Sequence, residues 1–183
     1  MDVSLLHTAQ LTADQLAAIR TMLDAAYDDA FADEDWDHAL GGIHAVVWEG
    51  DQPVAHGSVV RRQFLYAGPD IAWRNAEPFR VGYIEAVAVR ADRRRQGLGR
   101  AVITALTDIC LKGFAFGALS ASDEGMPLYH ALGWQLLRGS TFVLSASGAK
   151  RTAEEDGGIY VTPGAPIDLD GRLACDWRSG DVW

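Results

Sequence analysis

The order of hydrophobic and polar positions along the chain predicts alternating helices and strands. Thr12 and Gln15 form a capping-box pattern before a stripe of apolar residues at helical spacing, so a helix is expected after Thr12. A short apolar run at residues 3–6 predicts an edge strand. Further strands are predicted at residues 43–48, 54–65, 81–89, 114–120, 134–144 and 159–162, and further helices at 100–112 and 126–132.

Two of these segments indicate the fold class. Residues 81–89 are apolar on both faces, which is typical of a central strand. Turn residues at 49–52 join two strand-like runs, so an antiparallel hairpin is expected there. Residues 67–79 and 145–158 are predicted loops. With no repeat or linker in the sequence, the pattern predicts one mixed α/β domain over residues 1–183.

Composition narrows the classes of function. The 183 residues are 49% hydrophobic and 22% charged, as in an ordinary globular protein. The formal net charge of −9 argues against a general nucleic-acid binder and favours cationic partners. The sequence shows neither a membrane span nor a secretory signal, and Cys110 and Cys175 lack metal-ligand spacing. A cytoplasmic protein without a metal site is therefore expected.

The charges are unevenly distributed. Residues 90–100 hold five arginines against one aspartate, whereas residues 28–37 hold six carboxylates and no basic residue. Taken alone, the acidic run is typical of a solvated loop or helix face.

The arginine-rich segment lies between the predicted central strand and a helix. Gly97 and Gly99 allow a ligand to approach the backbone closely, and the first amides of a helix are unpaired donors at the positive end of its dipole. This arrangement suits a phosphate or pyrophosphate. The alternative is a strand-to-helix turn with solvated arginines. The P-loop pattern is absent, and a dinucleotide-binding fingerprint fits poorly.

The loop resembles the acetyl-CoA site of the GCN5-related N-acetyltransferases (GNAT). The resemblance implies a mixed, mostly antiparallel central sheet flanked by helices, with two splayed central strands. It also implies that the Val87 and Val89 backbone binds the pantetheine arm and the acetyl carbonyl. Tyr129, within a Leu-Tyr-x-x-x-Gly-Trp pattern, matches the family's general acid, although a core role is the alternative. The residues implied to hold the pyrophosphate are Arg94, Arg95, Gln96, Gly97, Leu98, Gly99 and Arg100.

Residues 35–45, 82–92 and 175–183 resemble more closely the aminoglycoside 2′-N-acetyltransferases, antibiotic-resistance enzymes within that superfamily. This resemblance implies a homodimer and direct attack by the substrate's 2′-amine in a ternary complex. Glu85 would be the base, directly or through water, unless it is a structurally paired carboxylate. The Val87 amide would stabilise the oxyanion and Tyr129 would protonate the thiolate. A C-terminal carboxylate on Trp183 is expected to face the aminoglycoside.

The same resemblance places the substrate contacts and shows three departures. Ala30 stands where the family has a substrate-binding Asp, with Asp28 and Asp29 adjacent. Ala86 replaces a Gly, and Glu155 stands where relatives have Asp. We expect these differences to affect affinity and drug range more than the reaction. The implied contacts are Asp35, Glu85, Ala86, Ser120, Glu155, Asp181 and Trp183.

Two other functions stay open. One is a GNAT enzyme that acetylates a different cationic amine, such as a polyamine or metabolite. The other is an acyl-CoA-binding sensor that has lost catalysis. The histidines show no paired ligand spacing, so packing or surface roles are expected for His7, His38, His44, His56 and His130.

Overall fold

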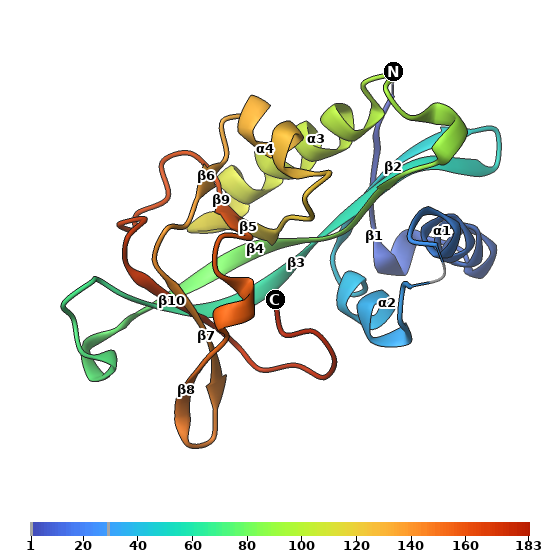
Figure 1. Ribbon diagram of the computed structural model, residues 1–183. Coiled ribbons are helices and arrows are strands. Elements are labelled where there is room, and N and C mark those ends of the chain that lie inside the picture. The colour runs from blue at the N-terminus through green and yellow to red at the C-terminus, as the bar shows by residue number, and fades with distance from the viewer. Residues whose placement is uncertain (1, 29) are drawn as a thin grey trace. The chain divides into compact units, whose positions relative to one another are not determined.

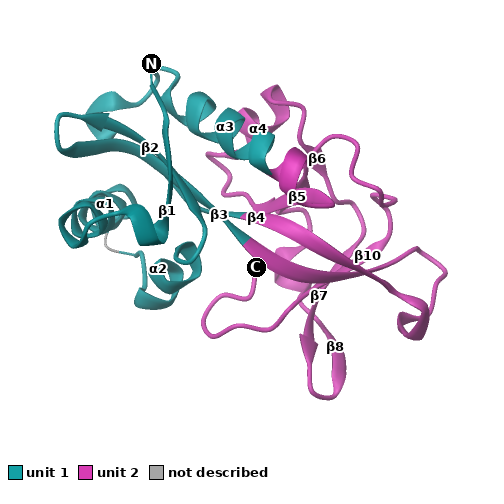
Figure 2. Ribbon diagram, turned by 180° about the vertical axis from the view of Figure 1, so that it is seen from behind, with its two compact units in different colours: residues 1–60, 84–109 teal, residues 61–83, 110–183 magenta. Residues whose placement is uncertain are grey.

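The computed structural model describes residues 2–28 and 30–183, which form two compact units (Figure 2). Unit 1 contains residues 1–60 and 84–109, and unit 2 contains residues 61–83 and 110–183. The helices are α1 (Ala13–Ala26), α2 (Asp33–Ala39), α3 (Leu98–Gly113) and α4 (Met126–Ala131). The strands are β1 (Ser4–His7), β2 (Ile43–Glu49), β3 (Gln52–Ala67), β4 (Glu77–Val89), β5 (Phe116–Ser120), β6 (Gln135–Leu136), β7 (Ser140–Ser145), β8 (Gly148–Arg151), β9 (Ile159–Val161) and β10 (Arg172–Cys175).

Unit 1 packs two helices against antiparallel strands. β1 pairs with β2. β2 forms an antiparallel hairpin with β3, as predicted. The capping box of α1 is present: Thr12 Oγ1 accepts from the Gln15 amide at 3.2 Å, and Gln15 Oε1 accepts from the Thr12 amide at 3.0 Å. Figure 1 shows α1 and α2 beside β1. The core between these elements contains Leu11, Ile19, Met22, Leu23, Phe31, Val46 and Ala88.

Unit 2 contains the strand order β6-β9-β5-β4-β3-β10-β7-β8. The β6–β9, β9–β5, β3–β10 and β7–β8 pairings are antiparallel and the β4–β5 and β10–β7 pairings are parallel, so the sheet is mixed and mostly antiparallel, as predicted. The β4–β5 ladder runs from Val81 opposite Phe116 to Tyr83 opposite Ala118 and ends there, whereas β4 continues to Val89. A ladder that ends before β4 does is what the prediction of splayed central strands requires.

Several of the predicted elements are wrong, and the predicted loop at 67–79 ends early because β4 begins at Glu77. Residues 134–144 form two strands, β6 and β7, because the Arg138 and Gly139 amides both turn to bind the Leu169 carbonyl. The predicted loop at 145–158 contains β8, which forms a hairpin with β7, and a 3₁₀ turn at Ala153–Glu155. Strand β10 in the C-terminal tail was not predicted, because its pairing partners are distant in sequence.

The second part of the acidic run, from Asp33 onward, lies in the short helix α2, whose first turn carries three carboxylates. Acidic side chains at a helix N-terminus are favourable because they face the positive end of the helix dipole. None of the helices in the described ranges is long and apolar enough to cross a bilayer.

Candidate functional site

The centre of the candidate site in unit 1 is an irregularity in β4 at Ala86. Ala86 has a φ of 50°, a left-handed conformation that costs a non-glycine residue about 1–2 kcal/mol. Glu85 and Val87, on either side, are both half-buried. The Ala86 carbonyl accepts a hydrogen bond from His56 Nδ1 at 2.8 Å, and the Val87 carbonyl accepts one from the Tyr27 hydroxyl at 3.0 Å. Side chains from β3 and from the end of α1 thus hold the backbone beside Glu85.

His56 is the last member of a buried chain of hydrogen bonds. Its Nε2 lies 2.9 Å from His44 Nδ1, and His44 Nε2 lies 2.8 Å from Thr8 Oγ1. Both rings are fully buried. Burial lowers the pKa of His44 to about 4, and burial together with the nearby His44 lowers the pKa of His56 to about 3. Both imidazoles are therefore neutral at physiological pH.

Because both buried histidines are neutral in the folded protein, we expect the protein to lose stability at acidic pH. In the unfolded chain their pKa is near the ordinary 6.5, so below that pH the unfolded state binds protons that the folded state does not. The free energy of unfolding should therefore fall as the pH drops from 6.5 towards 4, by up to about 1.4 kcal/mol per pH unit for each ring. Urea unfolding measured between pH 7 and 4.5 checks this. A variant with both histidines replaced by Asn should have a shallower slope, and an unchanged slope contradicts the assignment.

Tyr27 was missed in the sequence because no motif surrounds it. It follows α1 as the C-cap residue and stacks on Phe31 at 5.2 Å between ring centroids. Burial of its hydroxyl, followed by the Glu85 and Asp35 carboxylates, raises the pKa of Tyr27 to about 12. The negative charges of two predicted substrate-binding carboxylates, Glu85 and Asp35, thus both act on the Tyr27 hydroxyl. Asp35 also has a structural role, because its Oδ2 accepts from the Ala32 amide at 3.0 Å at the start of α2.

The glycine-containing loop at the start of α3 has the backbone of an anion-binding turn. Arg95 and Gly97 have φ values of 63° and 82°, and α3 begins at Leu98, whose side chain is buried. Alternating left-handed residues direct successive amides into a concave turn, and the helix dipole adds positive potential there. The predicted loop thus has a geometry suited to a phosphate group.

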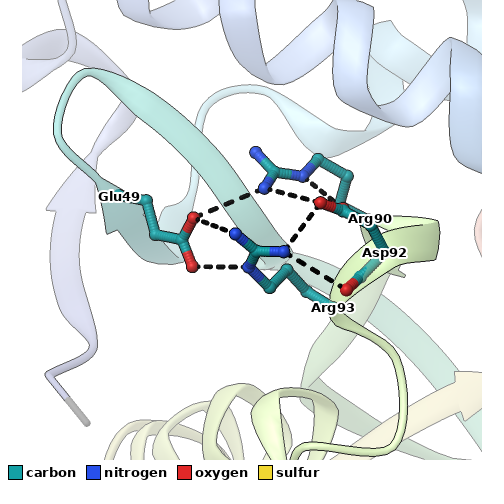
Figure 3. Close-up of polar contacts among 4 residues, drawn as sticks. All are labelled: Glu49, Arg90, Asp92 and Arg93. Atoms are coloured by element: carbon teal, nitrogen blue, oxygen red, sulfur yellow. Dashed lines mark hydrogen bonds and ion pairs between the residues drawn. The ribbon is translucent and has the colours of Figure 1, made fainter.

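Two of the loop's arginines are bound to carboxylates of unit 1 (Figure 3). Arg93 donates from Nε and Nη2 to Glu49 at 2.7 and 2.9 Å, and Arg90 donates from Nε to Asp92 at 2.6 Å. The hydrogen bonds from Arg93 and Arg90 hold the pKa of Glu49 and Asp92, respectively, below their ordinary values. The carboxylates of Glu49 and Asp92 therefore offset part of the positive charge of Arg90 and Arg93.

The other three arginines of this segment have different surroundings. Arg94, Arg95 and Arg100 are exposed, and within residues 2–28 and 30–183 they have no ion-pair partner. The charge that can meet an anion at the start of α3 therefore comes from these three side chains.

Unit 2 brings together another part of the predicted site. Ser120 Oγ lies 3.4 Å from Glu155 Oε2, at the end of β5. Burial, followed by the nearby Asp181 and Glu154, raises the pKa of Glu155. Neighbouring carboxylates disfavour one another's ionised form, and a cation placed between them stabilises that form. Ser120, Glu155 and Asp181 therefore form a local environment suited to a cationic group.

The C-terminal segment of unit 2 is held by specific contacts. Trp183 is buried, its Nε1 donates to Thr152 Oγ1 at 3.0 Å, and its ring meets Phe64 edge-on at 5.2 Å between centroids. The Trp183 amide donates to Asp181 Oδ1 at 3.1 Å, and its main-chain oxygen accepts from Arg178 Nη2 at 2.9 Å. The last residues are thus fixed beside Asp181.

Tyr129, the predicted general acid, lies in α4 and is buried. Its ring centroid is 6.1 Å from those of both Trp134 and Tyr160, and Tyr160 hydrogen-bonds through its hydroxyl to His130 Nε2 at 3.0 Å. The aromatic packing that the core interpretation required is therefore present in unit 2.

Ala30, which stands where the family has an Asp, follows Asp29, and Asp29 lies outside the residues that the structure describes. Asp28 has a φ of 52°, and the Ala30 amide donates to the Tyr27 carbonyl at 2.9 Å.

Comparisons with known proteins give the context of this geometry. The model of the acetyltransferase (GNAT) family matches residues 10–134. The chain is 40% identical to an aminoglycoside 2′-N-acetyltransferase of Mycolicibacterium fortuitum over 184 aligned positions, which cover 98% of this chain and 90% of that one.

Two solved Escherichia coli structures share the fold. The ribosomal-protein-S18-alanine N-acetyltransferase has a TM-score of 0.58 at 18% identity, covering 91% of this chain and 97% of its own. ElaA has a TM-score of 0.57 at 18% identity, covering 87% of this chain and 96% of its own.

Proposed function

The chain belongs to the acetyltransferase (GNAT) family, and from this premise we propose that it acetylates the 2′-amino group of aminoglycosides with acetyl-CoA as the donor. The observation that carries the substrate class is the 40% identity with an aminoglycoside 2′-N-acetyltransferase along nearly the whole of both chains. The carboxylates among the expected substrate contacts support this substrate class, because an aminoglycoside carries several ammonium groups that need negative partners.

The acetyl-CoA site is proposed at the loop that begins α3. The amides of residues 95–100, with Arg94, Arg95 and Arg100, would bind the pyrophosphate, which the left-handed turn at Arg95 and Gly97 supports. The backbone of Val87 and Val89 would bind the pantetheine arm. It lies in the part of β4 beyond the last residue of the β4–β5 ladder.

The proposed reaction is a direct transfer without a covalent enzyme intermediate. The lone pair of the neutral 2′-amine attacks the thioester carbonyl carbon, so a C–N bond forms and the C–S bond breaks. Glu85 takes the amine proton, directly or through water, and the Tyr129 hydroxyl gives a proton to the leaving thiolate. The Val87 amide stabilises the negative charge that develops on the carbonyl oxygen. Trp183 is proposed to help order the substrate or this water.

The proposed substrate contacts fall into two groups. Asp35, Glu85 and the Ala86 backbone belong to unit 1, and Ser120, Glu155, Asp181 and Trp183 belong to unit 2. The raised pKa of Glu155 supports its role, because a bound ammonium would relieve the repulsion from Asp181.

The remaining proposals concern the protein as a whole. The shared strands β3 and β4 support a single domain over residues 1–183, since neither unit is a continuous piece of chain. We expect a cytoplasmic protein, which the unpaired state of the buried Cys110 and Cys175 supports. A homodimer that does not bind nucleic acid is expected from the family resemblance and the net charge of −9.

A pair of related drugs tests the proposed function. Kanamycin B has a 2′-amine and kanamycin A has a 2′-hydroxyl, so we expect CoA release with the first and none with the second. Equal turnover of both would refute 2′ transfer. Turnover of polyamines alone would indicate a different cationic substrate, and acetyl-CoA binding without turnover of any amine would indicate a sensor.

A further inference from the structure

The hydrogen-bond chain through the two buried histidines ends on one particular peptide group. The oxygen that His56 Nδ1 contacts at 2.8 Å belongs to Ala86, and the nitrogen of that same peptide group belongs to Val87. This inference rests on the proposed function, in which the Val87 amide is the oxyanion donor. We propose that the His44–His56 pair is a positioning device that aims the Val87 N–H at the thioester carbonyl and strengthens it as a donor.

Because the peptide bond is planar, holding its carbonyl oxygen also fixes the direction of its N–H. In a trans peptide the C=O and N–H point in opposite directions within one plane. The Ala86–Val87 bond is trans. A ring that fixes the Ala86 oxygen on one side therefore fixes the direction of the Val87 N–H on the other. The left-handed φ of 50° at Ala86 makes such a restraint necessary, because an unheld non-glycine residue would relax towards an extended strand.

The second step is the direction of the hydrogen bonds. A carbonyl only accepts, so His56 Nδ1 must carry the proton and His56 Nε2 must accept. His44 Nδ1 is then the donor to His56, and His44 Nε2 accepts from the Thr8 hydroxyl. The Thr8 oxygen in turn accepts from the Gly41 amide at 2.9 Å. The Thr8 oxygen also lies 3.3 Å from the Gly42 carbonyl, but its one proton goes to the closer His44 Nε2, which has to accept. Every donor in the chain then points towards Ala86, and such aligned bonds polarise one another. The N–H of the last peptide becomes a stronger donor as a result.

The surroundings exclude a simpler role for the pair. Both rings are 0% exposed, so they are not solvated polar side chains. A proton relay is also excluded, because the chain ends on a carbonyl oxygen that has no proton to pass on. The Tyr27 hydroxyl holds the next carbonyl, that of Val87, at 3.0 Å. Side chains therefore restrain both peptide oxygens that flank the residue proposed to bind the oxyanion.

The tautomers give a test on the unmodified protein. The proposal requires both His44 and His56 to be neutral with the proton on Nδ1 at pH 7. Long-range ¹H–¹⁵N correlation spectra of ¹⁵N-labelled wild-type protein identify the tautomer of each ring. Two Nδ1–H rings support the proposal. A proton on Nε2 of His56, or a charged ring, would overturn it, because neither state fits the chain of donors.

Two substitutions at His56 separate positioning from packing. His56→Asn keeps an amide donor near the position of Nδ1, whereas His56→Leu keeps apolar volume and loses the donor. We expect kcat to fall about 10- to 100-fold in the Leu variant, with the KM for acetyl-CoA within about twofold of wild type. The Asn variant should retain kcat within about fivefold of wild type. If His56 only fills space, Leu should be the better replacement, and that order of activities refutes the proposal.

The outcomes distinguish this proposal from the proposed function. Wild-type turnover of the 2′-amine tests the function alone and does not depend on the histidines. The comparison of Asn with Leu uses whichever amine the wild-type protein acetylates. The thermal unfolding midpoint of each variant shows whether it is folded at the assay temperature. If the Leu variant is unfolded, the tautomers of the wild-type protein decide.

Discussion

Replacement of Glu85 by Gln is expected to lower kcat by about 10²- to 10⁴-fold, the usual contribution of a general base. Glu85 lies in β4 next to the left-handed Ala86, and its carboxylate is close enough to raise the pKa of Tyr27. Gln has the same shape but cannot accept the amine proton. The measurement is steady-state CoA release with an accepted aminoglycoside between pH 6 and 9. The wild-type rate should rise with pH as the substrate's amine loses its proton, and the Gln variant should stay slower than wild type over the whole range.

Glu77→Gln is the matched control. Glu77 begins the same strand and is exposed, so the kcat of the Glu77→Gln variant should stay within about twofold of wild type. The thermal unfolding midpoint of both variants should be close to that of wild type, since Gln preserves the volume of Glu. If Glu85→Gln also keeps wild-type kcat, Glu85 is not the base, and a structurally paired carboxylate becomes the correct interpretation.

The elements that the sequence predicts well are those specified by neighbouring residues. The capping box of Thr12 and Gln15 forms as expected, because both partners lie within one helical turn. The hairpin of β2 and β3 also depends on a local turn. Strand β10 is different, since its four residues pair with β3 and β7, which are far away in the sequence. No local pattern could have predicted that pairing.

The same distinction applies to the candidate site. The left-handed turn at Gly97 was foreseeable because glycine favours it, whereas the left-handed Ala86 was not. His56 is 30 positions from Ala86, and Tyr27 is 60 positions from Val87. Contacts of this range leave no spacing signal in one sequence. A count of charges along residues 90–100 likewise leaves out Glu49, which lies 44 positions from the Arg93 that it binds.

A large loss of stability is expected from a substitution beside β10, the strand that the sequence did not predict. Gly139→Ala is expected to lower the free energy of unfolding by about 3 kcal/mol or more, because overpacking of this kind cannot be relieved by a side chain. A Cβ at Gly139 would lie 1.7 Å from the Gly171 oxygen and 2.7 Å from the Gly171 carbonyl carbon. Both are backbone atoms, so the chain itself would have to move. Urea unfolding at constant pH measures the loss.

The position of the two glycines explains why the effect should be large. The parallel pairing of β7 and β10 starts at the next residues, Ser140 opposite Arg172, so a displaced backbone at Gly139 disturbs the whole ladder. Gly113→Ala is the matched control, because a Cβ there meets no atom within 4 Å, and its stability should stay within about 0.5 kcal/mol of wild type. A Gly139→Ala protein as stable as Gly113→Ala would contradict the close approach of the two strands. Gly139 and Gly171 can lie against each other only while Gly139 has no side chain. The pairing of β7 with β10 begins directly after this contact, so it depends on that close approach.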